Sequence, residues 1–77
     1  MIEEHERAVL KRDLPEKGLV AGDVGTVVSV HAGEGDEPAG YTLEFFSPAG
    51  ETITLATVTA DDVRATGARE VLHARAL

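Results

Sequence analysis

Apolar residues in this chain gather in short segments, and glycine, proline and charged residues separate these segments. The clearest segment is VGTVVSVH, residues 24–31, whose four valines and one threonine are typical of a β-strand. Strict alternation would place every second residue from Val24 on one face of that strand. Val27 interrupts the alternation, so we expect either a strand covered on both faces or a β-bulge that shifts the register.

Two further segments predict a β-hairpin. YTLEFF, residues 41–46, and ETITLATVT, residues 51–59, are joined by the short turn sequence SPAG. Because side chains alternate along a strand, we expect Phe46 on the face opposite the core. The same alternation predicts five inward-pointing residues: Tyr41, Leu43, Phe45, Ile53 and Leu55.

The remaining segments predict two short strands and one turn of helix. Charged residues flank the apolar patch within residues 6–13, which favours an edge strand over the competing helix. Residues 59–62 carry a capping pattern with room for a single 3-10 turn, and residues 63–65 predict a closing strand. Five short, mostly antiparallel strands predict an all-β domain, a small SH3-like barrel. An open α+β meander is the alternative.

The chain of 77 residues is expected to be one domain, with the barrel over residues 1–66. Residues 67–77 form a C-terminal extension rich in good helix formers, and Thr66 can cap its start. A short C-terminal helix is therefore one expectation. Docking of the extension on the barrel, contact with a partner and a loose tail remain open.

Charge is distributed unevenly along the chain. The formal net charge is −7, and no Lys or Arg occurs between Lys17 and Arg64. Binding to a phosphate backbone requires such cations, so nucleic acid is disfavoured as a ligand of the central region. Its carboxylates serve either to solvate loops and outer faces or to meet a basic protein partner.

No pattern of residues indicates catalysis, a cofactor or a metal site. Gly22 and Gly25 precede a strand rather than a helix, so we expect Gly22 to turn the chain and Gly25 to allow a bend or bulge, not a phosphate cradle. The three histidines are far apart in sequence and show no ligand spacing. There is no cysteine, no apolar run long enough to span a membrane and no signal-like N-terminus, so the predicted location is cytoplasmic.

Phe46 is the most informative surface candidate. It lies either in a second small core beneath residues 67–77 or in an exposed contact surface for a partner. Together with aromatic and acidic neighbours, it forms the predicted set of partner-binding residues: Tyr41, Glu44, Phe46, Asp61 and Asp62.

RDLPEKGLVAGDVGTVVSV, residues 12–30, followed by TLATVTADDVRA, residues 54–65, resembles a family of small bacterial domains of unknown function. The resemblance covers roughly residues 8–65 and implies an SH3-like barrel without an established activity. Some members are similar in context to toxin-associated or immunity-type proteins. Gly25-Thr26-Val27 with the glycine turn before it is more loosely similar to the KOW motif of ribosomal proteins and transcription elongation factors, but the basic RNA-contacting loop of that family is missing. The glycine-to-valine turn is also similar to that of the SH3-like subunits of photosystem I and nitrile hydratase, which are structural or accessory subunits.

These observations favour a non-enzymatic, acidic protein-binding module, of the immunity or antitoxin kind or an accessory subunit. A homodimer is compatible with the sequence, and an enzyme would need a site shared between subunits. The alternative is a KOW-like ribosome- or RNA-binding protein that uses basic residues near the chain ends: Arg7, Lys11, Arg12, Lys17, Arg64, Arg69 and Arg75.

Overall fold

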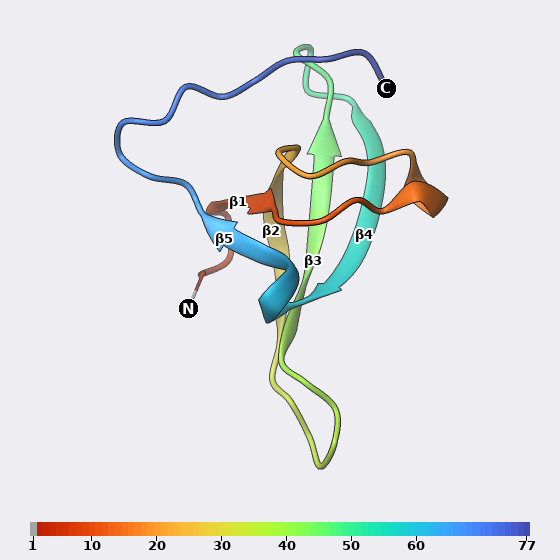
Figure 1. Cartoon of the computed structure of the whole chain (residues 1–77), viewed down its shortest axis with the longest axis vertical. Helices are drawn as coiled ribbons and strands as arrows, with labels where there is room; N and C mark the ends of the chain where they lie inside the picture. The colour runs from red at the N-terminus through yellow and green to blue at the C-terminus, as the bar shows by residue number, and fades with distance from the viewer. Residues whose placement is uncertain (1) are drawn as a thin grey trace.

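The computed structural model describes residues 2–77 and contains five β-strands and two 3-10 turns (Figure 1). The all-β expectation is therefore confirmed, with a second 3-10 turn in addition to the predicted one. The elements are β1 (Arg7–Leu10), η1 (Pro15–Lys17), β2 (Val24–His31), β3 (Gly40–Phe46), β4 (Thr52–Thr59), η2 (Ala60–Asp62) and β5 (Val63–Ala65).

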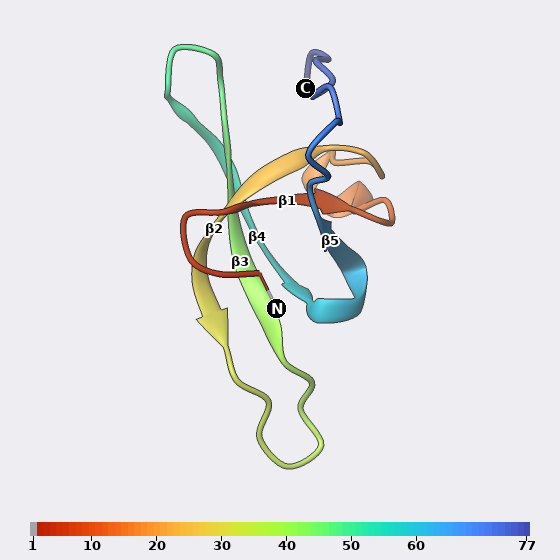
Figure 2. The same ribbon diagram turned by 90° about the vertical axis from the view of Figure 1, so that its left-hand side faces the viewer.

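The strands form one antiparallel sheet in the order β4-β3-β2-β1-β5. The short strand β1 pairs with the start of the long strand β2 on one side and with β5 on the other (Figures 1 and 2). Within residues 2–77, β4 and β5 are not hydrogen-bonded to each other, so the sheet is not closed into the predicted barrel. Both strands consequently remain edges of the sheet.

A single cluster of buried side chains holds this sheet together. The predicted alternation of β3 is confirmed, because Tyr41, Leu43 and Phe45 all point into the cluster. Leu10, Val27 and Leu43 are its largest fully buried side chains, and each comes from a different strand. Burial of one such side chain contributes about 1.5–3 kcal/mol, so this cluster is the main stabilising element of the fold.

The irregular valine pattern of β2 is explained by a bulge. The register between β2 and β3 shifts between Val27 and Ser29. Before the shift Val27 is fully buried, and after it Val30 packs against the core. The extra residue therefore lets two valines three positions apart face the same side, as the bulge alternative predicted.

The predicted orientation of β4 is wrong. Ile53 and Leu55 point outward and are each about half exposed, whereas Ala56 and Val58 are buried. The reason is the register with β3, since residues directly opposite each other share a face of the sheet. The inward residues of β3 oppose Thr54, Ala56 and Val58.

The predicted C-terminal helix is also absent. Residues 66–77, which we call the tail, contain a turn but no helix or strand. An isolated segment of this length is a marginal helix in water even when its residues favour helix. In Figure 1 the tail runs from β5 across one end of the molecule.

The two glycines before and within β2 have different roles. Gly22 has a φ of +98°, which confirms its predicted turn. Gly25 has no positive φ and does not form the bulge. A Cβ atom there would lie 2.9 Å from the ring of Phe45 and 3.2 Å from Leu43, so its role is to let the Phe45 ring pack against the backbone.

We predict that Gly25→Ala lowers the free energy of unfolding by about 1–3 kcal/mol, because the added methyl group overpacks the core. Urea denaturation monitored by circular dichroism measures this loss. Gly67→Ala is the matched control, since the new Cβ atom would meet only the Glu70 side chain, at 3.3 Å or more. A Gly25→Ala protein as stable as the control would contradict this role.

Candidate functional site

Among residues 2–77, the buried charged residue is Asp23, with 7% of its surface exposed. It lies directly before β2, after the turn at Gly22. Its carboxylate accepts a hydrogen bond from the Val20 backbone N–H at 2.9 Å, and its own N–H donates to the Val20 carbonyl at 3.1 Å. The side chain is thus part of the turn that starts the strand, as is common for Asp at such positions.

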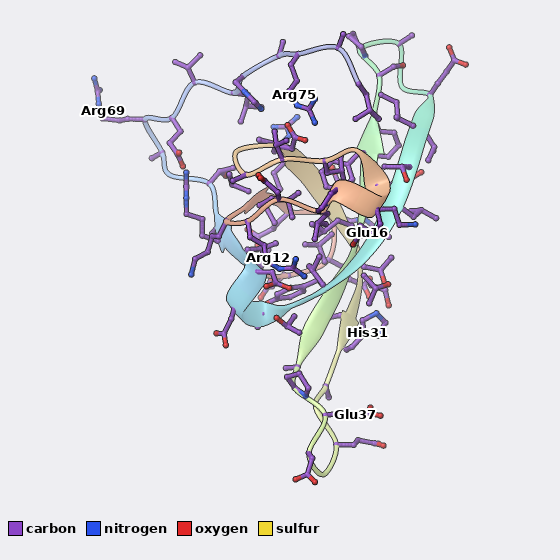
Figure 3. All side chains as sticks on the ribbon, turned by 45° about the vertical axis from the view of Figure 1, so that its right-hand side comes forward. Arg12, Glu16, His31, Glu37, Arg69 and Arg75 are labelled. Atoms are coloured by element: carbon purple, nitrogen blue, oxygen red, sulfur yellow. The ribbon has the colours of Figure 1, made fainter. Side chains whose placement is uncertain are left out.

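Two side chains of the tail bind this carboxylate from 50 and 52 residues away. The Arg75 guanidinium donates through Nε to Oδ1 at 2.8 Å and through Nη2 to Oδ2 at 2.6 Å. The same Nη2 donates to the Gly18 carbonyl at 2.9 Å, and His73 Nε2 lies 3.1 Å from Oδ1. Figure 3 shows Arg75 pointing from the tail toward the sheet. Bidentate pairing of this kind is the strongest geometry available to an arginine and a carboxylate.

This arrangement keeps Asp23 ionised. The hydrogen bond from Arg75 is the main cause that lowers the pKa of Asp23 to about 2, and the hydrogen bonds from Val20 and His73 act in the same direction. Burial opposes them, because it disfavours the charged form. At neutral pH the carboxylate is therefore a fixed negative charge that requires a cation beside it.

An open hollow of about 440 Å³ lies between the tail and the β3–β4 hairpin, and we call it the Asp23 hollow. Figure 2 shows the tail and the tip of this hairpin standing apart. Phe46 and Ile53 line the hollow on the hairpin side, and Leu72 and Leu77 line it on the tail side. Phe46 therefore shares a hollow with the tail but remains 45% exposed.

The structure separates the other predicted partner-binding residues. Tyr41 lies in the core, where its hydroxyl accepts a hydrogen bond from the Ile2 N–H at 3.1 Å. Glu44 lines the Asp23 hollow with Phe46 and accepts a hydrogen bond from the Thr52 hydroxyl. The set thus does not form one surface, because Asp61 and Asp62 lie on η2 and neither lines this hollow.

Asp61 is exposed, whereas Asp62 has structural partners. Asp62 accepts a hydrogen bond from the Thr59 N–H at 3.1 Å, which completes the predicted capping box. Its carboxylate also binds Arg12 Nε at 2.9 Å, and this hydrogen bond is the main cause that lowers the pKa of Asp62. Asp62 therefore stabilises the end of β4 in addition to any role at the surface.

A second open hollow, of about 740 Å³, lies beside the acidic loop 32–39. Glu34, Glu37 and Asp62 line it together with Arg12 and His31. This loop projects from the end of the molecule opposite the tail, as Glu37 shows in Figure 3. We call residues 32–39 with 61–62 the acidic end.

No group of three potential metal ligands occurs among residues 2–77.

Internal ion pairs increase the charge asymmetry. Arg12 pairs with Asp62, Arg64 pairs with Glu70, and Arg75 pairs with Asp23. Among residues 2–77, eleven of the fourteen carboxylates and four of the seven Lys and Arg side chains lie outside these pairs.

Sequence reasoning missed Asp23 as a site, because it treated this residue as one acid of the solvated central region. No local pattern links Asp23 to a residue more than fifty positions away. The available signals were a carboxylate directly after the turn glycine Gly22 and an arginine in a tail that had no assigned role.

Comparison with known proteins adds a family but no activity. Residues 4–65 match the model of DUF4926, a domain of unknown function, and the tail lies outside this match. No curated protein and no solved structure matches the chain. No helix among residues 2–77 is long and apolar enough to cross a membrane.

We predict that Arg75→Gln raises the pKa of Asp23 from about 2 toward its ordinary value of 3.8, because the hydrogen bond from Arg75 is the main cause of the lowered value and burial then acts with less opposition. NMR titration that follows the chemical shift of the Asp23 carboxyl carbon measures this pKa. The Glu70 pKa, which Arg64 lowers, serves as the internal control and stays unchanged.

The same shift predicts how stability depends on pH. Because the pKa is depressed in the folded state, the contribution of Asp23 is complete above about pH 4–5 and is lost as the pH falls toward 2. It amounts to about 2 kcal/mol. Wild-type and Arg75→Gln proteins should therefore converge in stability at low pH, and a constant difference would contradict the linkage.

Proposed function

We propose a function for this chain from its geometry, since the chain belongs to the DUF4926 family and the function of that family is unknown. The chain is a non-catalytic module that binds a basic protein partner. It acts as an immunity-like or antitoxin-like protein or as an accessory subunit. The cytoplasm is its proposed location.

The observation that carries this proposal is the excess of negative charge on the surface. Internal ion pairs occupy Arg12, Arg64 and Arg75, while the acidic loop at the far end holds Glu34, Asp36 and Glu37 without a cation from the loop itself. Such a surface attracts a positively charged protein and raises the rate of association. It repels partners of the same sign, including nucleic acids.

The perturbed carboxylates support a binding role over a catalytic one. Asp23 and Asp62 are held ionised by arginines, and their pKa values are lowered rather than raised toward neutrality. A general acid or base works best when its pKa lies near the operating pH. These two carboxylates instead form ion pairs that stabilise the fold, and they stay negatively charged at neutral pH.

RNA binding is the less favoured alternative. Three of the seven cations that it would use are already bound to carboxylates of the same chain. Each phosphate contact needs a Lys or Arg that can release a counterion from the nucleic acid, and a cation held by a carboxylate is less available for this exchange.

The test uses the full-length chain to isolate its partner from the cytoplasm of its own cells, followed by titration of the purified partner. We expect the affinity to fall about tenfold or more between about 0.1 M and about 1 M salt, as the screening length falls from about 10 to about 3 Å. The combined variant Glu34→Gln, Asp36→Asn and Glu37→Gln should cause a similar loss at low salt.

The matched control removes three carboxylates elsewhere, by Glu3→Gln, Glu4→Gln and Glu51→Gln, and should retain most of the affinity. Binding that ignores both salt and the acidic end would refute the proposed recognition. A gel shift of structured RNA at micromolar protein would instead favour the RNA alternative.

A further inference from the structure

We propose that the Asp23 carboxylate and the Gly18 carbonyl, beside the Asp23 hollow, form a binding site for an extended peptide segment that carries an arginine, and that Arg75 of the tail occupies this site until a partner segment displaces it. This inference rests on the proposed function, because the segment belongs to the basic protein partner. It assigns that partner a specific side chain and a second contact, at the end of the domain opposite the acidic end (Figures 1 and 3).

The chemistry of the site selects arginine. Asp23 presents both carboxylate oxygens, and the Gly18 carbonyl lies close enough to receive a third hydrogen bond from the same guanidinium. A planar guanidinium fits these three acceptors at once, whereas a lysine ammonium is a point charge without this fork. A buried carboxylate left without a cation would be costly, so the site is not expected to remain empty.

The body of the domain builds the site without help from the tail. The Val20 N–H orients the Asp23 carboxylate. The Leu10 N–H donates to the Asp23 carbonyl at 2.9 Å, and the Gly22 N–H donates to the Leu10 carbonyl at 2.8 Å. These residues all lie within the segment that matches the family. The tail supplies the ligand and not the receptor.

The tail is held in a way that permits displacement. Side chains make the hydrogen bonds between the tail and the domain. The backbone hydrogen bond of the tail is internal, from the Glu70 N–H to the Gly67 carbonyl, and within residues 2–77 no backbone hydrogen bond joins the tail to the sheet. Val71 is 94% exposed, and Leu72 and Leu77 are only half buried. A short tether gives such a segment an effective concentration of about millimolar. A partner segment with additional contacts can therefore compete with it.

The tail also indicates which neighbours the arginine should have. Leu77, two positions after Arg75, lies beside Gly18, since a Cβ atom on Gly18 would be 3.6 Å from the Leu77 methyl group. Alternate residues of an extended segment share a face, so an arginine and a following aliphatic residue can reach the domain together. Exposed Phe46 and Ile53 in the same hollow offer apolar surface that the tail leaves uncovered.

The experiment measures binding of a fluorescent peptide, GAREVLHARAL, to full-length protein by anisotropy. We expect the Arg75→Gln protein to bind it about tenfold or more tightly than wild type, because its own tail no longer competes. Arg69→Gln is the matched control, since Arg69 points away from the site, and it should behave as wild type (Figure 3). Circular dichroism and thermal unfolding establish that each variant is folded.

Two changes test the arginine itself. A peptide with lysine in place of its second arginine should bind about tenfold or more weakly to the Arg75→Gln protein. Adding Asp23→Asn to this protein should abolish binding. Equal binding to wild-type and Arg75→Gln proteins, or equal binding of the lysine peptide, would overturn the proposal.

The remaining outcomes separate this proposal from the proposed function. If the peptide fails to bind but the partner still binds in a salt-dependent manner, only the assigned site is wrong. If wild-type protein is a dimer on gel filtration and Arg75→Gln is a monomer, the occupant is the tail of a second copy and the partner proposal fails. If the peptide binds as expected but no salt-dependent partner exists, the arginine site is supported and the proposed function is contradicted.

Discussion

A negative charge buried at the start of a central strand is the constraint that organises this small domain. Asp23 cannot leave water without hydrogen bonds and a cation, and both requirements are met by the chain itself. The turn before β2 supplies the backbone donor, and the tail supplies the cation. This ion pair joins the family domain to a segment outside it. Together with the Arg64–Glu70 pair, it holds the twelve residues of the tail, which have no secondary structure of their own beyond a turn.

Short-range patterns predicted the fold well because the forces behind them act locally. The valines of β2, the alternation of β3 and the capping box at Thr59 each identified their element. The interruption at Val27 predicted either two covered faces or a bulge, and the structure has the bulge. Which face of β4 is buried could not be predicted in this way, since each of its two faces carries both Thr and aliphatic residues. Its orientation follows from pairing with β3, which only the assembled sheet determines.

The candidate site depended on contacts that no sequence window contains. Asp23 and Arg75 are 52 residues apart, and neither stands in a pattern that indicates the other. The C-terminal helix, one of the expectations for the tail, is absent, and the side chains of His73 and Arg75 instead bind Asp23 of the domain. Composition could identify the acidic character of the chain, but not which carboxylates the fold would pair.

Strand β4 carries one further consequence, for behaviour at high concentration. It is an edge strand of eight residues, TITLATVT, without a charge, a proline or a glycine, and its outward side chains include Ile53 and Leu55. Edges of this kind are templates for pairing with another chain, and proteins protect them with charged side chains, prolines, bulges or a covering segment. Here the protection comes from the charge of the whole molecule, since two copies at −7 repel each other. Acidification toward the isoelectric point removes that repulsion and leaves a free β-edge exposed, so storage of this protein favours neutral pH and low salt.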